Sequence, residues 1–190
     1  MRAKAIFLDR DGVLNREVDV LRDVKQLRVL PGVAVALRTF TKRGFLNIII
    51  TNQPVIARGW LTERGVEHIN EVLLQRLAAR GARIDAVYYC PHHPNANLKK
   101  YRVKCACRKP AVGMIKNAVK DFQIDLKKSF FVGDTTMDIM TGRNAKLKTI
   151  LVKTGYAGHD GRYNVKPDFT AKNLMGAVRI IAAYVRTTTF

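Results

Sequence analysis

The sequence predicts an α/β fold built on a mainly parallel sheet. Short apolar runs rich in β-branched residues alternate along the chain with segments of helical periodicity. This alternation is typical of strands and helices that wind around one sheet. The length of 190 residues fits one domain with a substantial core, which we expect to span residues 1–190.

Three strands and two helices are expected in the first half of the chain. The apolar run Lys4 to Leu8 predicts the first strand, and the helical spacing of Val33 to Arg43 predicts the first helix. A second strand is expected at Phe45 to Ile50 and a third at Ala86 to Tyr89. The helix expected between them, Thr62 to Ala79, begins with a threonine, a residue type that caps free helix amides.

The second half of the chain continues the same alternation. A helix at Val112 to Phe122 follows a proline, which the first turn of a helix tolerates. Strands are expected at Ser129 to Val132 and Thr149 to Val152, with a helix at Met137 to Ala145 between them. A last helix is expected at Asn173 to Val185. The sequence shows no internal repeat.

The charge and composition of the chain limit its possible functions. The net charge is +19, from 34 basic and 15 acidic residues, which fits either a solvated basic face or a phosphate-bearing ligand, from a sugar phosphate to nucleic acid. An aspartate cuts off the first apolar run, which predicts neither a signal peptide nor a membrane span and favours the cytoplasm. Three cysteines, two of them one residue apart, favour metal ligation over a disulfide framework.

Polar residues follow three of the predicted strands. Asp9, Thr51 and Asp134 each lie at or just past the end of one strand. Ligand sites in open parallel sheets lie beyond the carboxyl ends of the strands. We therefore expect these three side chains to converge.

The first of these strand ends carries two carboxylates. Asp9 and Asp11 are two residues apart, and Gly12 permits a sharp turn. A carboxylate can attack phosphorus if a bound cation relieves its repulsion with the phosphate, which makes Asp9 a candidate nucleophile. Asp11 could protonate the leaving oxygen and then activate water, a role that favours a raised pKa. A plain turn or helix cap is the alternative.

A second pair of carboxylates, Asp134 and Asp138, stands at another strand-to-helix junction. Mg²⁺ prefers hard oxygen ligands and usually takes one or two carboxylates with water and phosphate. Asp134 is the expected direct ligand. Asp138 could orient a metal-bound water or a phosphate-binding side chain, or serve as an ordinary acid in the first turn of a helix.

Two ligand pairs of the C-x-H and C-x-C kinds stand farther along the chain. Cys90 with His92, and Cys105 with Cys107, could complete a closed tetrahedral Zn²⁺ site, which would be structural because no position is left for water. The metal would stiffen a loop that lacks a core of its own. Unrelated buried cysteines are the alternative, and His93 is the competing imidazole.

Further candidates for phosphate binding lie at the second strand end and after the cysteines. Thr51, Asn52 and Gln53 offer a hydroxyl and amides, while Arg108 and Lys109 bring positive charge. Such donors stabilise the charge that spreads over a transferring phosphoryl group. Because Arg108 directly follows the last cysteine, the metal would also hold both cations in place. A strand-end turn and a surface lysine are the alternatives for Thr51 and Lys109.

The combined pattern resembles the haloacid dehalogenase-like phosphatases. The motifs in chain order are Asp9-x-Asp11-Gly12, Thr51, Lys109 and Gly133-Asp134. The resemblance implies a Rossmann-like doubly wound sheet without a large cap domain. It also implies Asp9 as the nucleophile, Asp11 as acid and base, and Mg²⁺ held by Asp9, Asp134 and the main-chain carbonyl of Asp11.

The expected zinc loop, at about residues 90–107, narrows the resemblance. This loop is similar to the zinc loop of the D-glycero-D-manno-heptose 1,7-bisphosphate phosphatases, and the segment from Thr51 to Gly59 is similar to the corresponding segment of that family. That family removes the C7 phosphate on the way to nucleotide-activated heptose for bacterial lipopolysaccharide and other surface polysaccharides. The resemblance implies substrate recognition by Arg108 and the loop near Thr51. One departure is the segment Glu17 to Leu21, where many relatives carry a Gly-Tyr pair.

Alternative functions stay open at this point. Histidinol-phosphate phosphatases share the zinc arrangement, although their loop is usually shorter. The basic charge also fits a phosphatase acting on nucleic-acid 3′ ends, or a non-catalytic basic zinc-binding module. We expect a monomer whose partner is a small sugar phosphate, with no membrane partner; nucleic acid is not expected, although the charge leaves it open.

Overall fold

The computed structural model describes residues 2–187 and confirms the α/β fold. All strand pairs are parallel, and the six strands lie in the order β3-β2-β1-β4-β5-β6. The strands are β1 Lys4–Leu8, β2 Phe45–Asn52, β3 Ala86–Cys90, β4 Phe130–Gly133, β5 Lys148–Val152 and β6 Phe169–Ala171. The chain winds from β1 outward to β3, and then from β4 outward to β6.

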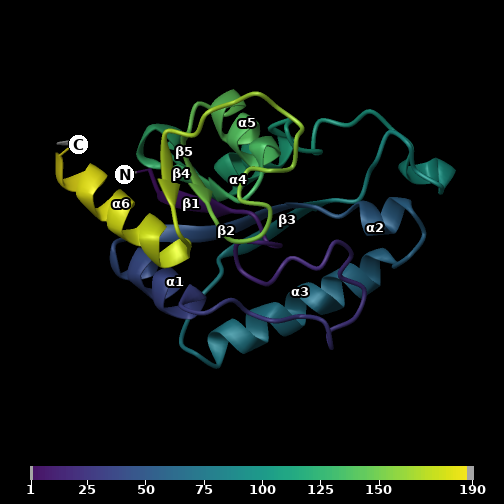
Figure 1. The fold of residues 1–190 in the computed structure, drawn as a ribbon, viewed down its shortest axis with the longest axis horizontal. Coiled ribbons are helices and arrows are strands. Elements are labelled where there is room, and N and C mark those ends of the chain that lie inside the picture. Colours follow the sequence, from purple (N-terminus) through teal and green to yellow (C-terminus); the bar gives the residue numbers. More distant parts are fainter. Residues whose placement is uncertain (1, 188–190) are drawn as a thin grey trace.

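Helices cover both faces of this sheet (Figure 1). They are α1 Val33–Lys42, α2 Pro54–Ala57, α3 Glu63–Ala78, α4 Gly113–Phe122, α5 Thr136–Asn144 and α6 Leu174–Thr187, with 3₁₀ turns η1 at Lys99–Tyr101 and η2 at Leu126–Lys128. Helices α1, α3 and α6 bury their apolar side chains in one core, and α4 contributes to a second core. The sheet is therefore the middle layer of three.

The position of β1 in the middle of the sheet explains why its sequence is almost wholly apolar. Ile6 and Leu8 belong to the core that α1, α3 and α6 share, whereas Ala5 and Phe7 belong to the core on the α4 face. Successive side chains of a strand point to opposite faces, so a strand covered on both faces favours apolar residues at successive positions. Asp9 comes directly after this run and ends it.

The predicted elements agree with the observed ones except at a few ends and in two short additions. Strand β2 continues through Asn52 because Thr51 and Asn52 pair with Tyr89 and Cys90 of β3. The sequence analysis missed α2 and β6, which are 4 and 3 residues long and too short to show periodicity. Thr62 caps α3 as expected, since its side chain accepts a hydrogen bond from the Gly65 N–H at 3.0 Å.

The loop between β3 and α4 extends beside α2, away from the body of the sheet (Figure 1). It has no separate core, but Ala96 and Tyr101 are buried against Val55 and Ile56 of α2 and Val66 of α3. No large cap domain covers the carboxyl ends of the strands within the described residues. Over the same range, no helix is both long and apolar enough to cross a membrane.

The sheet order places a topological switch point between β1 and β4. The connections run in opposite directions on either side of this point, which leaves a crevice at the carboxyl ends of the two strands. Leu8 of β1 is paired with Ile49 of β2 and with Val132 of β4. The polar residues that follow these strands therefore start from neighbouring positions.

Candidate active site and metal centre

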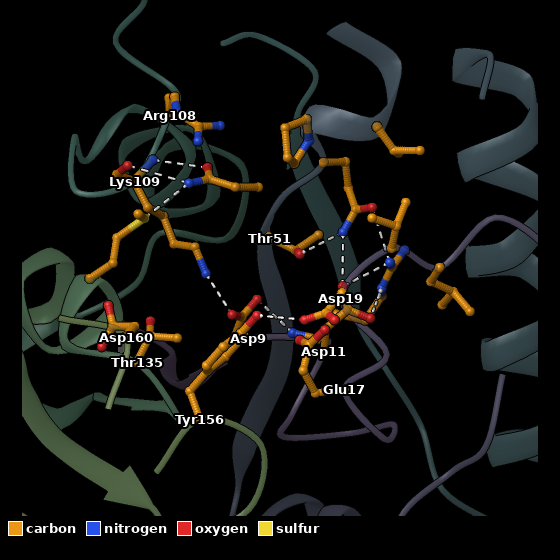
Figure 2. A pocket seen from close by; sticks show the side chains of 18 of the residues that line it. Asp9, Asp11, Glu17, Asp19, Thr51, Arg108, Lys109, Thr135, Tyr156 and Asp160 are labelled. Atoms are coloured by element: carbon orange, nitrogen blue, oxygen red, sulfur yellow. Dashed lines mark hydrogen bonds and ion pairs between the residues drawn. The ribbon is translucent and has the colours of Figure 1, made fainter. Parts of the chain in front are cut away.

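Asp9 occupies the crevice and is held from two sides. Its carboxylate accepts a hydrogen bond from the Arg10 N–H at 2.7 Å and pairs with Nζ of Lys109 at 2.9 Å. Lys109 is only 3% exposed and also pairs with Asp138 at 2.6 Å. Figure 2 shows the Lys109 side chain reaching from its loop to Asp9. A buried cation thus bridges the ends of β1 and β4.

Three carboxylates gather around this one lysine. Oxygen atoms of Asp9, Asp134 and Asp138 lie within 4.8 Å of one another. Both oxygens of Asp138 have donors, because Oδ1 accepts from Lys109 at 2.6 Å and Oδ2 accepts from Thr135 N–H at 3.1 Å. Oδ1 of Asp134 is buried without a hydrogen-bond partner among the described residues. Asp134 is therefore the one of these three carboxylates that has an oxygen left for a cation.

Two glycines shape the surroundings of Asp134. A Cβ atom at Gly12 would lie 2.2 Å from Oδ2 of Asp134, and one at Gly155 would lie 2.1 Å from the same oxygen. Both glycines also have a positive φ, at 77° and 61°, which side chains rarely adopt. The chain is thus closely fitted around a carboxylate that lacks one partner. With three carboxylates and one ammonium, this cluster suits a divalent cation with hard oxygen ligands, such as Mg²⁺.

The burial of these carboxylates and their closeness to one another also change their pKa values. Burial and the charge of Asp138 raise the pKa of Asp9 to about 7, although Lys109 opposes them. Burial, with the charges of Asp138 and Asp9, raises the pKa of Asp134 to about 9. When no cation is bound, protonation of these carboxylates reduces the repulsion among them.

The pKa of Asp11 is lowered, whereas its expected role as acid and base favours a raised pKa. Burial would raise its pKa, but the charge and hydrogen bonds of Arg10, aided by Asn15 and Gln53, lower it below its usual range. Nη2 of Arg10 lies 2.8 Å from Oδ2 of Asp11, and Nδ2 of Asn15 lies 2.8 Å from Oδ1. The raised pKa falls on Asp9 instead. The sequence analysis missed Arg10, a buried arginine that stands between the two acids of the first motif.

Asp138 combines the two roles considered for it. It forms a capping box with Thr135 at the start of α5, which satisfies free amides of that helix. Its other oxygen holds Lys109. The helix cap therefore also fixes the position of the Lys109 side chain.

The end of β2 contributes three polar side chains to this region. Thr51 is buried, and its hydroxyl accepts a hydrogen bond from Nε2 of Gln53 at 3.0 Å. Nε2 of Gln53 also lies 3.1 Å from Asp11. The Asn52 side chain accepts from the Lys109 N–H at 3.0 Å and donates to its carbonyl at 3.3 Å. Asn52 thus holds the backbone of Lys109.

The four predicted zinc ligands converge in the loop between β3 and α4. Sγ of Cys107 lies 3.0 Å from Cys90, 3.2 Å from Cys105 and 3.3 Å from Nδ1 of His92. The four ligand atoms all lie within 4.8 Å of one another, and His93 is not among them. All three cysteines are free of disulfides. A closed set of three sulfurs and one imidazole nitrogen is the donor set of a structural Zn²⁺ site.

This Cys/His cluster is linked to Lys109 through Arg108. The guanidinium of Arg108 donates to the His92 carbonyl at 3.0 Å, so it is tied back to the cluster. Lys109 follows directly and enters the site. The Cys/His cluster therefore adjoins the backbone from which Lys109 enters the site.

The site opens into a cavity of about 230 Å³ lined by residues of several segments. Besides the predicted residues, the lining includes Glu17, Asp19, Arg58, Tyr156, Asp160 and Arg162. The Tyr156 hydroxyl donates to Asp19 at 3.0 Å, which joins the loop after β1 to the loop after β5 (Figure 2). The sequence analysis noted the Glu17 segment only as a departure. Tyr156, Asp160 and Arg162 lie between predicted elements and gave no periodic signal.

Comparison with known proteins places this geometry in a family. A family model described as HAD-hydrolase-like matches residues 106–177. The D-glycero-β-D-manno-heptose-1,7-bisphosphate 7-phosphatase of Pasteurella multocida is 42% identical over 153 residues, which is 80% of this chain and 83% of the relative. The enzyme of the same name from Escherichia coli K12 is 40% identical over 152 residues, covering 80% of each chain.

Solved structures agree with the sequence comparison. The D,D-heptose 1,7-bisphosphate phosphatase of B. bronchiseptica, complexed with magnesium and phosphate, superposes with a TM-score of 0.82 at 28% identity, covering 96% of this chain and 99% of that one. The fold and site define a HAD-like hydrolase. The identity to curated relatives goes further: the chain belongs to the family of the D-glycero-D-manno-heptose 1,7-bisphosphate phosphatases.

Proposed function

We propose that the protein is a Mg²⁺-dependent phosphomonoesterase that removes the C7 phosphate of D-glycero-D-manno-heptose 1,7-bisphosphate through an aspartyl-phosphate intermediate. The observation that carries this proposal is the Asp9 carboxylate at the cavity floor, paired with buried Lys109 beside the unpartnered oxygen of Asp134. The names of relatives about 40% identical support the substrate.

Asp9 is the proposed nucleophile because its carboxylate is held in place from two sides. Attack by an oxygen of Asp9 on the phosphorus atom forms the aspartyl phosphate and expels the sugar oxygen. Lys109 and the Thr51 hydroxyl would bind the phosphoryl oxygens, where fixed donors are most effective as negative charge redistributes. Asp138 keeps Lys109 pointed at this position.

Asp11 is the proposed acid and base. It would protonate the leaving sugar oxygen and then take a proton from the water that attacks the aspartyl phosphate. In the substrate-free structure its carboxylate is bound by Arg10. Catalytic hydrogen bonds often form only once the substrate is bound, so Asp11 would exchange Arg10 for the leaving oxygen.

Mg²⁺ is the proposed cofactor. Asp9, Asp134 and the main-chain carbonyl of Asp11 would hold it, and the unpartnered Oδ1 of Asp134 supports this assignment. When bound, the cation reduces the repulsion between the Asp9 carboxylate and the phosphate.

We further propose that Cys90, His92, Cys105 and Cys107 hold a structural Zn²⁺ and that the protein works in the cytoplasm. The mutual approach of the four ligand atoms supports the metal. Thiolate ligands persist in a reducing compartment, which supports the location.

The chain would act as one domain, residues 1–190, and as a monomer; residue 1 and residues 188–190 lie outside the described structure. One chain supplies the whole lining of the cavity, so no second copy is needed to complete it. A small sugar phosphate suits a cavity of about 230 Å³ better than nucleic acid does, and we propose no nucleic-acid or membrane partner.

The test is phosphate release with Mg²⁺ from heptose 1,7-bisphosphate, histidinol phosphate and a 3′-phosphorylated oligonucleotide. We expect a preference for the heptose and no activity in Asp9→Asn. A preference for another substrate would overturn the heptose assignment while leaving the chemistry intact. Activity that survives in Asp9→Asn would overturn the mechanism.

A further inference from the structure

Arg10 is a buried arginine whose three guanidinium nitrogens all have partners. Its side chain is 1% exposed. Nε and Nη2 donate to Asp11, Nη2 also donates to Gln53 at 3.0 Å, and Nη1 donates to Asn70 at 2.9 Å. Burying a charged group is costly unless it is paired and hydrogen-bonded, which these contacts achieve. Asn70 and Gln53 therefore hold the guanidinium independently of Asp11.

The carboxylate of Asp11 receives two donors at each of its oxygens. Oδ1 accepts from Nε of Arg10 at 3.3 Å and from Nδ2 of Asn15 at 2.8 Å. Oδ2 accepts from Nη2 of Arg10 at 2.8 Å and from Nε2 of Gln53 at 3.1 Å. The two oxygens of a carboxylate offer about four acceptor positions. Arg10 is the one of these donors that contacts both oxygens, so it sets the orientation of the carboxylate plane.

Asn70 is a polar residue on the apolar face of α3. It is 6% exposed, and the other buried residues of this helix are Val66, Ile69, Leu73 and Leu77. A buried amide needs hydrogen-bond partners, and Oδ1 of Asn70 accepts from the guanidinium that holds Asp11. Asn70 does not line the cavity itself. Helix α3 therefore supports an acid of the active site from outside the cavity.

We propose that Arg10 is the positioning residue for Asp11 and that Asn70, from α3, fixes the orientation of Arg10. The proposal rests on the proposed function, because it concerns Asp11 as the acid and base of that reaction. The Nε contact to Oδ1 is the longer of the two contacts from Arg10. Oδ1 exchanges this contact for the leaving sugar oxygen, while Nη2 keeps Oδ2 in place. Asp11 thus turns toward the substrate about one fixed oxygen.

The first test uses two substrates that differ in their need for an acid. One is the best sugar phosphate substrate of the wild type, whose leaving oxygen needs a proton, and the other is 4-nitrophenyl phosphate, whose leaving group needs none. Arg10→Gln should lower the ratio of kcat/KM for the sugar phosphate to kcat/KM for 4-nitrophenyl phosphate about 10- to 100-fold, because the acid is misplaced. An unchanged ratio, whether both values fall or neither does, would overturn the positioning role.

Asn70 allows the same test without removing a buried charge, so the test stands even if Arg10→Gln fails to fold. Asn70→Ala should lower the ratio about 10-fold, whereas Asn70→Asp keeps an oxygen for Nη1 of Arg10 and should retain most of it. Asn70→Ala should have no further effect on the ratio in an Arg10→Gln background. Gln75→Ala removes an amide from an exposed position of α3 and is the control. Equal effects of Asn70→Ala and Asn70→Asp would overturn the role of Asn70.

Asp11→Asn separates this inference from the proposed function. If Asp11 is the acid, Asp11→Asn should lower the same ratio at least as much as Arg10→Gln does. A ratio that Asp11→Asn leaves unchanged would overturn the role of Asp11 in the proposed function, and the inference with it. A ratio that falls in Asp11→Asn but not in Arg10→Gln or Asn70→Ala would overturn the inference alone. We expect the ratio to fall in all three variants and to keep its wild-type value in Gln75→Ala.

Discussion

Substitution of Asp134 by asparagine should stabilise the metal-free protein while abolishing activity. Asp134 is completely buried, and its Oδ2 accepts a hydrogen bond from the Tyr156 N–H at 2.8 Å. The oxygen of asparagine can keep this bond. The amide nitrogen would replace the unpartnered Oδ1, and the side chain would be neutral within the cluster of three carboxylates without having to bind a proton. Active-site residues commonly reduce stability in this way.

The magnitude follows from the raised pKa. The pKa of Asp134 is about 9 in the folded protein against an ordinary value of 3.8. Near pH 7 the folded state keeps a proton that the unfolded chain has lost, which costs at most roughly 4 kcal/mol at about 1.4 kcal/mol for each pH unit. Because the folded state binds more protons between these two pKa values, the unfolding free energy of the wild type falls as the pH rises through this window.

The assay is urea denaturation in magnesium-free buffer, without a chelator that would strip a metal from the Cys/His cluster. The variant should be more stable than the wild type near pH 7, and its advantage should shrink by about 1.4 kcal/mol for each pH unit toward lower pH. Added Mg²⁺ should stabilise the wild type and leave the variant unchanged. Asp121→Asn, at an exposed carboxylate on α4, is the control. A variant that is no more stable than the wild type near pH 7 would refute this reasoning.

Three further predictions concern the metal loop and the lysine that follows it. Cys107→Ser should lose zinc and lower the melting temperature, because structural zinc binding is coupled to folding; a full equivalent of zinc by metal analysis would contradict the ligand set. Lys109→Met should lower kcat by about 100- to 1000-fold in a phosphate-release assay, and a loss under tenfold would contradict its role at the phosphoryl group. Asn52→Ala should lower kcat about 100-fold by freeing the backbone of Lys109, and an unchanged kcat would show that Asn52 is not needed there.

Much of the fold could be predicted because its signals are local. Strand β1 matches its predicted bounds, Lys4–Leu8, because its four buried residues, which face both sides of the sheet, are all apolar. Thr62 marked the start of α3 because a threonine side chain can cap the free amides of the first helical turn, which is also a local interaction. Strand β6 was missed because its three residues depend on pairing with β5, a contact that no short stretch of sequence encodes.

The clustering of the candidate residues could be predicted where they end a strand or form a recognisable pair. Asp9 and Asp134 were found because the ends of parallel strands meet at one edge. The low pKa of Asp11 was not anticipated, since it depends on the direction in which the Arg10 side chain points. Arg162 was also missed, because it reaches the cavity from an irregular segment whose path only the folded chain defines.

The nucleophile can be tested most directly by trapping the aspartyl phosphate. Asp11→Asn, mixed with an aryl phosphate whose leaving group needs no protonation, should form the intermediate but hydrolyse it slowly. Borohydride reduction of a phospho-aspartate yields homoserine, which peptide mass spectrometry can locate. We predict homoserine at position 9, and none when Asp9 is also replaced by asparagine. Phosphate release without a trapped product at position 9, or a product at another residue, would contradict the assignment of Asp9 as the nucleophile.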